Sequence, residues 1–244
     1  MNTSVAPPIR KSLLYRAAED FFWLQNRRYP RKTCLELVGN RYQLHALERQ
    51  FLQRGVFSQC QILSRRAKRC LGADWQSENL VVDGHNVQIT VESGILGRLL
   101  LLANDGVVRD LAGQSARFKF SEVGELALQA ILQCLSEFRP REVLFLFDAP
   151  MHHSGLLASR YRRQIKALEL CGEARTAPVP EREFPYAESV IASSDQAVLD
   201  AATRWLDLAR RVLEQSGLAC PVMDFSALMP AASHCRDLLS ADFS

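Results

Sequence analysis

Four short apolar runs in this chain each end on an aspartate, and this repeated pattern most constrains the fold. The runs with their terminal acids are residues 79–83, 143–148, 190–195 and 220–224. Apolar runs of this length, separated by helix-like segments, are typical of parallel strands that are buried on both faces of a sheet. In an open α/β sheet the ligand site lies outside the carboxyl ends of the strands. We therefore expect Asp83, Asp148, Asp195 and Asp224 to meet at one edge, with Asp224 the weakest member because it can be a simple turn residue.

The segments between these runs predict a doubly wound α/β domain. Strands are expected at 79–83, 99–103, 143–148, 190–194 and 220–223, and helices at 87–95, 121–138, 156–171 and 196–216. For 87–95 a strand is the alternative, because the segment contains β-branched residues. Ser121 is expected to cap the second of these helices. Irregular structure is expected at 104–117, 149–155 and 172–187, where glycines or prolines gather. This order of elements is that of a mostly parallel sheet flanked by helices.

The first part of the chain predicts a small all-α unit with a basic surface. Helices are expected at 12–26, 41–54 and 58–71. Residues 1–74 hold 14 Lys and Arg against 5 Asp and Glu, a net charge of +9, whereas the remainder holds 16 against 22, a net charge of −6. A basic segment beside an acidic remainder favours an anionic partner for the first part. A solvated helical surface explains the same charges equally well.

The length of 244 residues and the hydrophobic content of 48% allow one large domain or two modest ones. We assign residues 1–74 to the basic helical N-terminal unit and residues 75–229 to the α/β domain. Residues 230–244 are weakly patterned and are assigned to a C-terminal tail.

The cysteines and the lack of long apolar segments indicate a soluble protein of a reducing compartment. The seven cysteines are odd in number and no two have C-x-x-C spacing, so neither a disulfide framework nor a zinc cage is indicated. Residues 1–10 lack the apolar core of a signal peptide, and no stretch approaches the roughly 18 apolar residues of a membrane span. We expect a cytoplasmic location and no membrane partner; the oligomeric state stays open, a homodimer included.

Carboxylates at neighbouring strand ends predict a divalent-metal site. A carboxylate is a hard oxygen ligand, and Mg²⁺ or Mn²⁺ sites combine a few such ligands with waters and substrate phosphate. Empty, such carboxylates repel each other; a cation removes the repulsion and can activate water for attack on a phosphodiester. Asp83, Asp148 and Asp195 are therefore the candidate catalytic and metal-binding residues. The alternative is that each aspartate only makes a turn or caps the next helix.

Five further residues are candidates for supporting roles. Asn86 can orient the Asp83 carboxylate or cap a helix, and Ser194 can hold a phosphate or a water. In the glycine-containing loop after residue 103, Arg109 is a candidate phosphate contact, and Asp105 and Asp110 are candidate extra carboxylates. Turns and surface salt bridges are the alternative for these three charged residues.

Two basic helix faces are candidates for binding a nucleic-acid backbone. Arg65, Arg66 and Arg69 lie on the helix predicted at 58–71, and Arg160 and Arg163 lie on the helix predicted at 156–171. Lys and Arg side chains spaced along a helix can follow a phosphate backbone. A solvated helix face has the same composition.

These motifs resemble a known superfamily. Residues 82–87, Val-Asp-Gly-His-Asn-Val, followed by Ser-Ser-Asp at 193–195, are similar to the PIN-like nucleases and especially to their NYN branch. Over about residues 12–225 the chain is also similar to the family called domain of unknown function 434. The pieces that carry this second resemblance are 37–42, 82–91, 103–113, 147–150 with 154–155, and 192–195.

The resemblance implies a PIN-like three-layer sandwich around the sheet and a metal-dependent ribonuclease-like site. The site residues it implies are Asp83, Asp148 and Asp195, with Asn86 and Ser194 in support. PIN-like enzymes often carry another acid on a central helix. The candidates for it in this chain are Glu122 and Glu125.

The leading hypothesis is a ribonuclease that depends on Mg²⁺ or Mn²⁺ and holds RNA through its basic helical unit. The alternatives are an RNA-binding module without catalysis and a phosphoester hydrolase that acts on a small molecule. A structural or partner-binding role for the helical unit is a further alternative.

Overall fold

The computed structural model describes residues 8–111, 122–218 and 220–228, which form two compact units. The described part of the helical unit comprises residues 8–63, 102–106 and 224–228. The α/β unit comprises 64–101 and the described residues of 107–223. The predicted cap Ser121 and the predicted tail 230–244 lie outside the described residues. Among the described helices, none is both long and apolar enough to cross a bilayer.

The helical unit is built from α1 (Lys11–Asn26), α2 (Arg31–Arg41), α3 (Ala46–Gly55) and the first part of α4 (Gln59–Ala67). The helices predicted at 12–26 and 58–71 are confirmed, although α4 ends earlier. The helix predicted at 41–54 is confirmed as α3 except for its start, because the chain turns at Tyr42 and α3 begins at Ala46. The helix α2, which follows Pro30, was not expected because its apolar residues do not form a clear stripe.

A capping box decides where α3 begins. The Nδ1 atom of His45 accepts a hydrogen bond from the Glu48 backbone N–H at 3.4 Å, and Glu48 Oε2 accepts one from the His45 backbone N–H at 3.2 Å. Ser, Thr, Asp and Asn are the usual residues at the N-cap. Histidine in this position gives no clear sequence signal, so the start of α3 could not be predicted.

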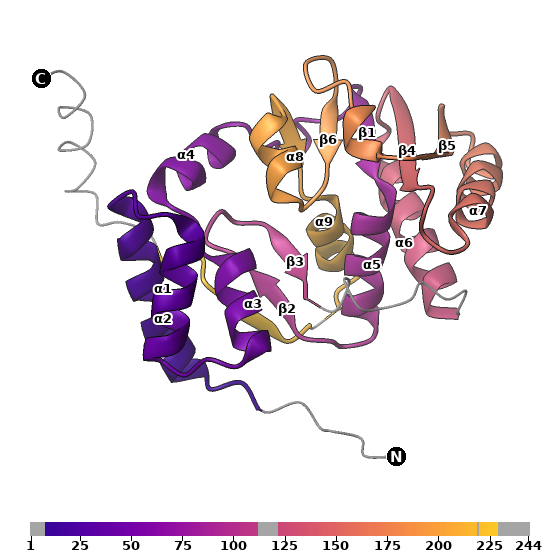
Figure 1. The fold of residues 1–244 in the computed structure, drawn as a ribbon. Helices are drawn as coiled ribbons and strands as arrows, with labels where there is room; N and C mark the ends of the chain where they lie inside the picture. Colours follow the sequence, from indigo (N-terminus) through magenta and orange to yellow (C-terminus); the bar gives the residue numbers. More distant parts are fainter. Residues whose placement is uncertain (1–7, 112–121, 219, 229–244) are drawn as a thin grey trace, which may run out of the picture. The chain divides into compact units, whose positions relative to one another are not determined.

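The α/β unit contains a five-stranded sheet in the order β5-β4-β1-β6-β7 (Figure 1). Its strands are β1 (Asn79–Asp83), β4 (Glu142–Asp148), β5 (Gly172–Ala177), β6 (Val190–Ala192) and β7 (Arg204–Leu206). Each neighbouring pair is parallel. The flanking helices are α5 (Gly84–Ile95), α6 (Glu122–Phe138), α7 (Ser154–Ala167), α8 (Gln196–Ala201) and α9 (Leu208–Gln215). The predicted α/β class with a mostly parallel sheet is confirmed.

Alternating side chains along the strands form a core on both faces of this sheet. On one face Val81, Leu146 and Ile191 pack with Val198 of α8 and with Trp205. On the other face the rings of Phe145 and Phe147 pack against Tyr161 of α7. A strand alternates its side chains between two faces. The continuous apolar runs in the sequence therefore follow from a sheet that helices cover on both sides.

A second sheet has three strands in the order β3-β2-β8. These strands are β2 (Leu100–Leu102), β3 (Val108–Asp110) and β8 (Val222–Asp224). The strand predicted near 99–103 is confirmed as β2, and β3 lies in the segment that was expected to be a loop. The expectation that Asp224 ends a strand of the main sheet is wrong, because β8 belongs to the other sheet.

Two segments of the α/β unit differ from their predicted structure. The segment 172–187 was expected to be irregular, yet it contains β5 and the short 3₁₀ helix η1 (Pro180–Arg182). The single long helix predicted at 196–216 is wrong, because β7 separates α8 from α9. Trp205 in β7 is fully buried, and Asp207 then caps α9 by accepting a hydrogen bond from the Arg210 N–H at 3.0 Å. A strand of three residues is too short to show a period in the sequence.

The strand order places the carboxyl end of β1 at a topological switch point. From β1 the sheet continues through β4 and β5 on one side and through β6 and β7 on the other. Helices that connect parallel strands in opposite directions leave a crevice at such a point, where ligands of doubly wound sheets bind. Asp83, the last residue of β1, lies there.

Gly84 is required for the close packing of α5 on β4. A Cβ atom at Gly84 would lie 2.4 Å from Cε1 of the buried Phe147 ring. We therefore expect Gly84→Ala to lower the free energy of unfolding by about 1–3 kcal/mol, the cost of overpacking a core. Gly155 is the matched control, because no described atom outside its own helix lies within 4 Å of its added Cβ. In urea denaturation Gly155→Ala should be neutral or stabilising; an equal loss for both variants would contradict this prediction.

Candidate functional site

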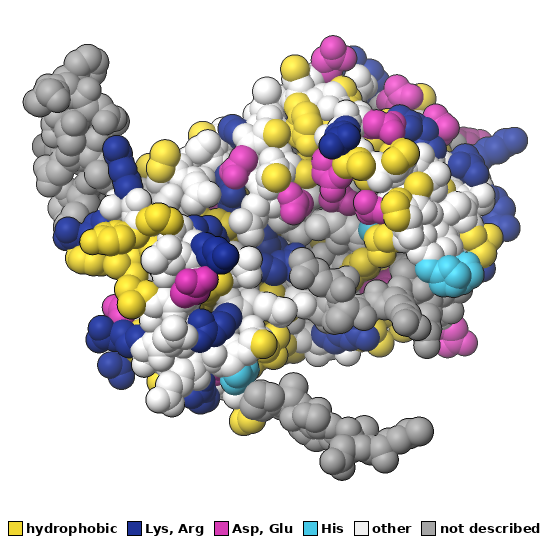
Figure 2. Space-filling model, viewed as in Figure 1, with side chains coloured by type: hydrophobic (Ala, Val, Ile, Leu, Met, Phe, Trp, Pro, Cys, Tyr) yellow, Lys and Arg dark blue, Asp and Glu magenta, His cyan; other side chains and the backbone are white. Residues whose placement is uncertain are grey.

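Three neighbouring strand ends bring the candidate residues together. In the β1–β4 pair Asp83 lies opposite Leu146, so Asp148 ends β4 two residues further along. In the β1–β6 pair Val82 lies opposite Ala192, so Ser193 lies beside Asp83. Figure 2 shows several Asp and Glu side chains gathered over this edge of the α/β unit. The predicted meeting of strand ends is thus observed for β1, β4 and β6.

Asp83 is buried and held by two hydrogen bonds. Its side-chain oxygens accept from the Ser193 hydroxyl at 2.8 Å (Oδ2) and from the Asn86 backbone N–H at 3.3 Å (Oδ1). The second bond caps α5, which begins at the next residue. Asp83 therefore caps α5, as the capping alternative predicts, and the same side chain lies at the strand end where the metal site is predicted.

The environment of Asp83 opposes its negative charge. Burial, with smaller contributions from the negative charges of Asp148 and Glu181, raises the pKa of Asp83 to about 7. The hydrogen bonds from Ser193 and Asn86 act in the opposite direction and only partly offset the effect of burial. A cation beside this carboxyl group would stabilise the ionised form.

His85 links the site to Asp148. Its Nδ1 atom accepts a hydrogen bond from the Asp148 backbone N–H at 3.0 Å and lies 3.3 Å from Asp148 Oδ2. Nδ1 is the acceptor in the neutral tautomer that carries its proton on Nε2, whereas a proton on Nδ1 would be donated to the Asp148 carboxylate. The imidazole is buried, and its ring meets the Phe147 ring edge to face. Sequence reasoning gave His85 no role; its place between Asp83 and Asn86 was the available signal.

The turn after β6 is locked by groups from three elements. Asn86 Oδ1 accepts a hydrogen bond from the Ser194 N–H at 2.8 Å, and Arg109 Nε donates to the Ser194 carbonyl at 2.9 Å. Ser193 Oγ, which donates to Asp83, also accepts from the Asp195 N–H at 3.1 Å. Asn86 was predicted to orient Asp83. Its backbone N–H contacts the Asp83 carboxylate, and its side-chain amide contacts Ser194.

Asp195 caps a helix at the edge of the site. Its Oδ1 accepts hydrogen bonds from the N–H groups of Ala197 at 2.8 Å and Val198 at 3.2 Å, at the start of α8. The capping alternative is therefore observed for this residue. Its charge still reaches the site, since Glu181, Asp195 and Asp83 all add to the rise that burial causes in the pKa of Tyr186.

Glu181 and Tyr186 are site neighbours that sequence reasoning missed. Glu181 belongs to η1, and its charge acts on the pKa values of both Asp83 and Tyr186, after the larger effect of burial on each. The Tyr186 hydroxyl donates to the Glu181 carbonyl at 3.0 Å. Both residues lie in the proline-containing segment that had no recognisable period, so only the folded chain places them here.

The predicted supporting residues of the 104–110 segment do not face the strand-end acids as a group. Arg109, predicted to contact phosphate, is 1% exposed and instead holds the Ser194 carbonyl. Asp105 is fully buried and belongs to the helical unit. Asp110 is buried at the end of β3, and its charge acts on the pKa of Glu92, which burial raises. Arg109 is therefore a positioning residue, and Asp105 and Asp110 stay predictions as carboxylate donors.

The arginines predicted to bind nucleic acid differ in their exposure to solvent and in their partners. Arg65 is fully buried and pairs with Asp200 through Nε–Oδ1 at 2.7 Å and Nη2–Oδ2 at 2.9 Å, so its assignment to a phosphate-binding face is wrong. Arg69 is half-buried over the Trp205 ring. Arg160 pairs with the candidate acid Glu125 at 2.9 Å. The exposed arginines of the two faces are Arg66 and Arg163.

A carboxylate pair, not a preformed cage, is available for a metal ion. Within residues 8–111, 122–218 and 220–228, no three or more His, Cys, Asp and Glu side chains are arranged to hold a metal. Mg²⁺ does not require such a set, because one or two carboxylates with waters and substrate phosphates often suffice. Asp83 and Asp148 interact through their charges at neighbouring strand ends. This pair fits a Mg²⁺ or Mn²⁺ site of that open kind.

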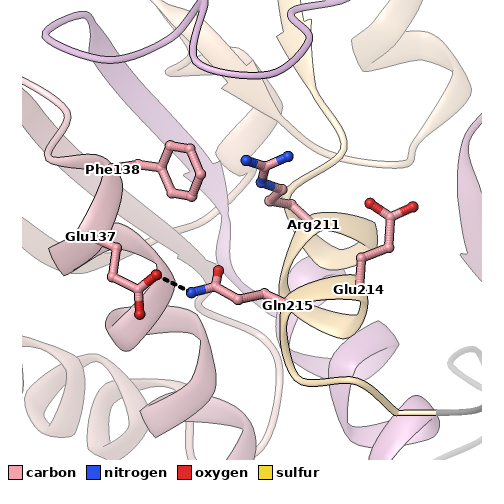
Figure 3. A pocket seen from close by; sticks show the side chains of 5 residues that line it. All are labelled: Glu137, Phe138, Arg211, Glu214 and Gln215. Carbon is pink, nitrogen blue, oxygen red and sulfur yellow. Dashed lines mark hydrogen bonds between the residues drawn. The ribbon is translucent and has the colours of Figure 1, made fainter.

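A pocket of about 290 Å³ lies elsewhere in the α/β unit, between α6 and α9 (Figure 3). It is lined by Glu137, Phe138, Arg211, Glu214 and Gln215. Gln215 donates a hydrogen bond to Glu137, and the Arg211 guanidinium lies 4.3 Å from the centre of the Phe138 ring. None of the described site residues lines this pocket, which the Gln215–Glu137 hydrogen bond and the Arg211–Phe138 contact span from α9 to α6.

Comparisons with known proteins place the chain among uncharacterised relatives. The family model "Protein of unknown function (DUF434)" matches residues 13–68, and "Domain of unknown function (DUF5616)" matches residues 73–211. The chain is 30% identical over 184 residues to "Uncharacterized protein MJ0935" of Methanocaldococcus jannaschii, which covers 75% of this chain and 88% of that protein. No solved structure matches the chain. The predicted resemblance to the DUF434 family is confirmed for residues 13–68, whereas most of the remaining predicted range, 12–225, matches the second family model.

The raised pKa of Asp83 predicts a pH-dependent stability. The folded chain holds this proton more tightly than the unfolded chain, in which an aspartate has a pKa of about 3.9. Between about pH 4 and about pH 7 the free energy of unfolding should therefore fall as the pH rises, by up to about 1.4 kcal/mol per pH unit from this group. Asp83→Asn should remove this slope in urea denaturation with EDTA present.

Asp224→Asn is the control for this measurement, because Asp224 is an exposed strand-end aspartate of the other sheet. It should keep the wild-type slope. If wild type and Asp83→Asn lose stability in parallel as the pH rises, the assignment of the slope to Asp83 is wrong.

Proposed function

For this chain, which belongs to the family "Domain of unknown function (DUF5616)" and carries a "Protein of unknown function (DUF434)" segment before it, we propose a divalent-metal-dependent ribonuclease activity in the α/β unit. The observation that carries the proposal is Asp83. A buried carboxyl group lies at the switch point of a parallel sheet, next to a second strand-end acid, and its surroundings disfavour its charge. Perturbed acids in such a position are typical of functional sites.

The PIN-like assignment is part of this proposal. It is supported by the motif Asp83-Gly84-His85-Asn86 at the end of the central strand and by the Ser193-Ser194-Asp195 turn beside it. The parallel sheet and the helices on its two faces support the three-layer arrangement. The separation of Asp224 from this edge leaves Asp83, Asp148 and Asp195 as the proposed acids, with Glu181 as a further one.

Asp83 and Asp148 would hold Mg²⁺ or Mn²⁺. When bound, a divalent cation supplies charge neutralisation and an activated water for attack on a phosphodiester. Ser193 fixes the orientation of the Asp83 carboxylate, and His85 fixes the backbone of Asp148. Asp195, whose Oδ1 caps α8, adds negative charge at the rim.

The turn of residues 193–195 would present polar groups to a phosphate of the substrate. Asn86 and Arg109 hold Ser194 through its N–H and its carbonyl, so the turn is positioned before substrate arrives. Preorganised groups need no reorganisation during the reaction. RNA as substrate is supported by the basic charge of residues 1–74, and a cytoplasmic location stays a prediction.

Asparagine substitutions of the two proposed metal ligands test the activity. Asp83→Asn and Asp148→Asn should each lower the rate of Mn²⁺-dependent cleavage of a single-stranded RNA by about 100-fold or more. This exceeds the roughly 10–100-fold typical of groups that only support a ligand. Asp224→Asn, a strand-end acid of the other sheet, should keep the wild-type rate. Circular dichroism should show that all three variants are folded.

The alternatives give different results in the same assay. Salt-sensitive RNA binding with no cleavage at any Mn²⁺ concentration selects a binding module without catalysis. The lack of a preformed three-ligand group among the described residues is the observation that favours this second function. Hydrolysis of p-nitrophenyl phosphate without RNA binding selects the small-molecule hydrolase. Cleavage that survives both asparagine substitutions contradicts the proposed site.

Ser193→Ala tests the support of Asp83. The change removes the hydroxyl that donates to Asp83 Oδ2 at 2.8 Å, so the carboxylate loses its fixed orientation. We expect the Mn²⁺ concentration needed for half-maximal cleavage to rise roughly 10–100-fold. Ser216→Ala is the control, since the Ser216 hydroxyl bonds only the last turn of α9. An unchanged Mn²⁺ requirement for Ser193→Ala would contradict the assigned role.

A further inference from the structure

A shallow pocket of about 210 Å³ lies on the helical unit between α1 and α2. It is lined by Asp20, Trp23, Leu24, Leu37, Val38 and Arg41. Trp23 and Leu37 are 54% and 59% exposed, although both are large apolar side chains. Exposed apolar groups gathered around a hollow mark an interaction site.

Trp23 differs from the other two tryptophans of the chain. Trp75 and Trp205 are fully buried, whereas one face of the Trp23 indole is covered by the Arg27 guanidinium at 3.9 Å. This cation–π pair forms a flat platform of an aromatic ring and a planar cation at the surface. Such platforms are what unpaired nucleobases stack on in complexes with single-stranded RNA.

Cationic groups line the same surface. Arg16, Asp20 and Trp23 follow one another at helical spacing on α1, and Arg27, its C-cap residue, comes four residues after Trp23. Arg41 Nε lies 3.6 Å from Asp20 Oδ2, which also accepts from the Tyr42 hydroxyl at 2.8 Å. Asp20 is thus engaged by neighbours, while Arg16, Arg27 and Arg41 are exposed.

The charge of the segment agrees with an anionic partner. Residues 1–63 hold 10 Lys and Arg against 4 Asp and Glu, and Glu48, one of these four acids, is buried in an ion pair with Arg10. In Figure 2, hydrophobic side chains over α1 and α2 have Lys and Arg side chains at their edge. A partner that offers flat apolar rings and negative charge together matches this surface better than an apolar protein helix does.

We propose that the α1–α2 pocket binds an unpaired base of single-stranded RNA on Trp23, with the neighbouring phosphates on Arg27 and Arg41. The inference rests on the proposed function for the class of substrate and assigns the place where that substrate is held. In this proposal the RNA contacts are residues of the helical unit and not the buried Arg65, which was predicted from the sequence. Stacking is tolerant of base identity, because every base has a π face.

Tryptophan fluorescence gives a direct test of the stacking. Acrylamide should quench Trp23 selectively, because Trp75 and Trp205 are fully buried. The full-length Asp83→Asn/Asp148→Asn double variant is used, so that binding is measured without cleavage. Saturating an unstructured RNA oligonucleotide should protect the accessible tryptophan from quenching, and a blunt RNA duplex should not. RNA that binds without changing the quenching overturns the proposal.

Substitutions in the same double variant measure the contribution of the ring. Trp23→Ala should weaken RNA binding roughly 5- to 150-fold, the loss typical of one stacked base, and Trp23→Phe should restore most of it. Leu126→Ala is the matched control, because Leu126 is 52% exposed on α6 of the other unit. Arg27→Gln and Arg41→Gln should each lower the slope of log Kd against log salt by about 0.7. Equal affinities of Trp23→Ala and Leu126→Ala for RNA overturn the proposal.

The two proposals fail in different ways. If the double variant binds RNA with Trp23 protected but the wild-type chain never cleaves RNA, the base site stands and the ribonuclease activity falls. If the wild-type chain cleaves RNA and Trp23→Ala cleaves it with the same kcat/KM, the activity stands and the base site falls. If RNA does not bind the double variant and a protein partner instead protects Trp23, the pocket is a protein-docking site and the base site falls.

Discussion

The burial of one carboxyl group, Asp83, is the constraint on which the rest of the site depends. A buried charge is unfavourable unless it is paired or hydrogen-bonded, and here the partners come from two other parts of the chain. Ser193 follows β6, and the Asn86 N–H lies in the first turn of α5. The same two hydrogen bonds hold β1, α5 and the turn after β6 in one arrangement. The stability of this edge and its proposed chemistry are therefore coupled.

The site combines structural and functional interpretations that the sequence could not separate. Asp83 caps α5 and Asp195 caps α8, as ordinary strand-end aspartates do. The same positions place Asp83 at the end of β1 and Asp195 three residues after the end of the adjacent strand β6. Capping fixes the direction of each carboxylate, and fixed direction is what a metal or phosphate site needs. A capping role is therefore no argument against a functional role in this fold.

The charged residues show why composition predicts partners better than it predicts individual contacts. The excess of Lys and Arg before residue 75 is distributed between core and surface. Arg65 is fully buried and forms a bidentate ion pair with the half-exposed Asp200, so removal of Asp200 would take away the carboxylate that pairs with this buried charge. Arg27 instead lies on an exposed indole ring. Both are arginines on amphipathic helices, and only their tertiary neighbours distinguish them.

Local patterns in the sequence determined the apolar strands that end on acids, most of the long helices and the α/β class. Those features depend on side-chain periodicity within a few residues, so they can be recognised before folding is known. The breaks around β5 and β7 depend on burial against distant residues, as for Trp205, and left no local signal. The register of β1 between β4 and β6 decided that Asp83, Asp148 and Ser193 share an edge, and that Asp224 lies on another sheet. The sequence by itself thus determined which residues are capable of this chemistry, and the pairing of strands far apart in the chain decided which of them meet.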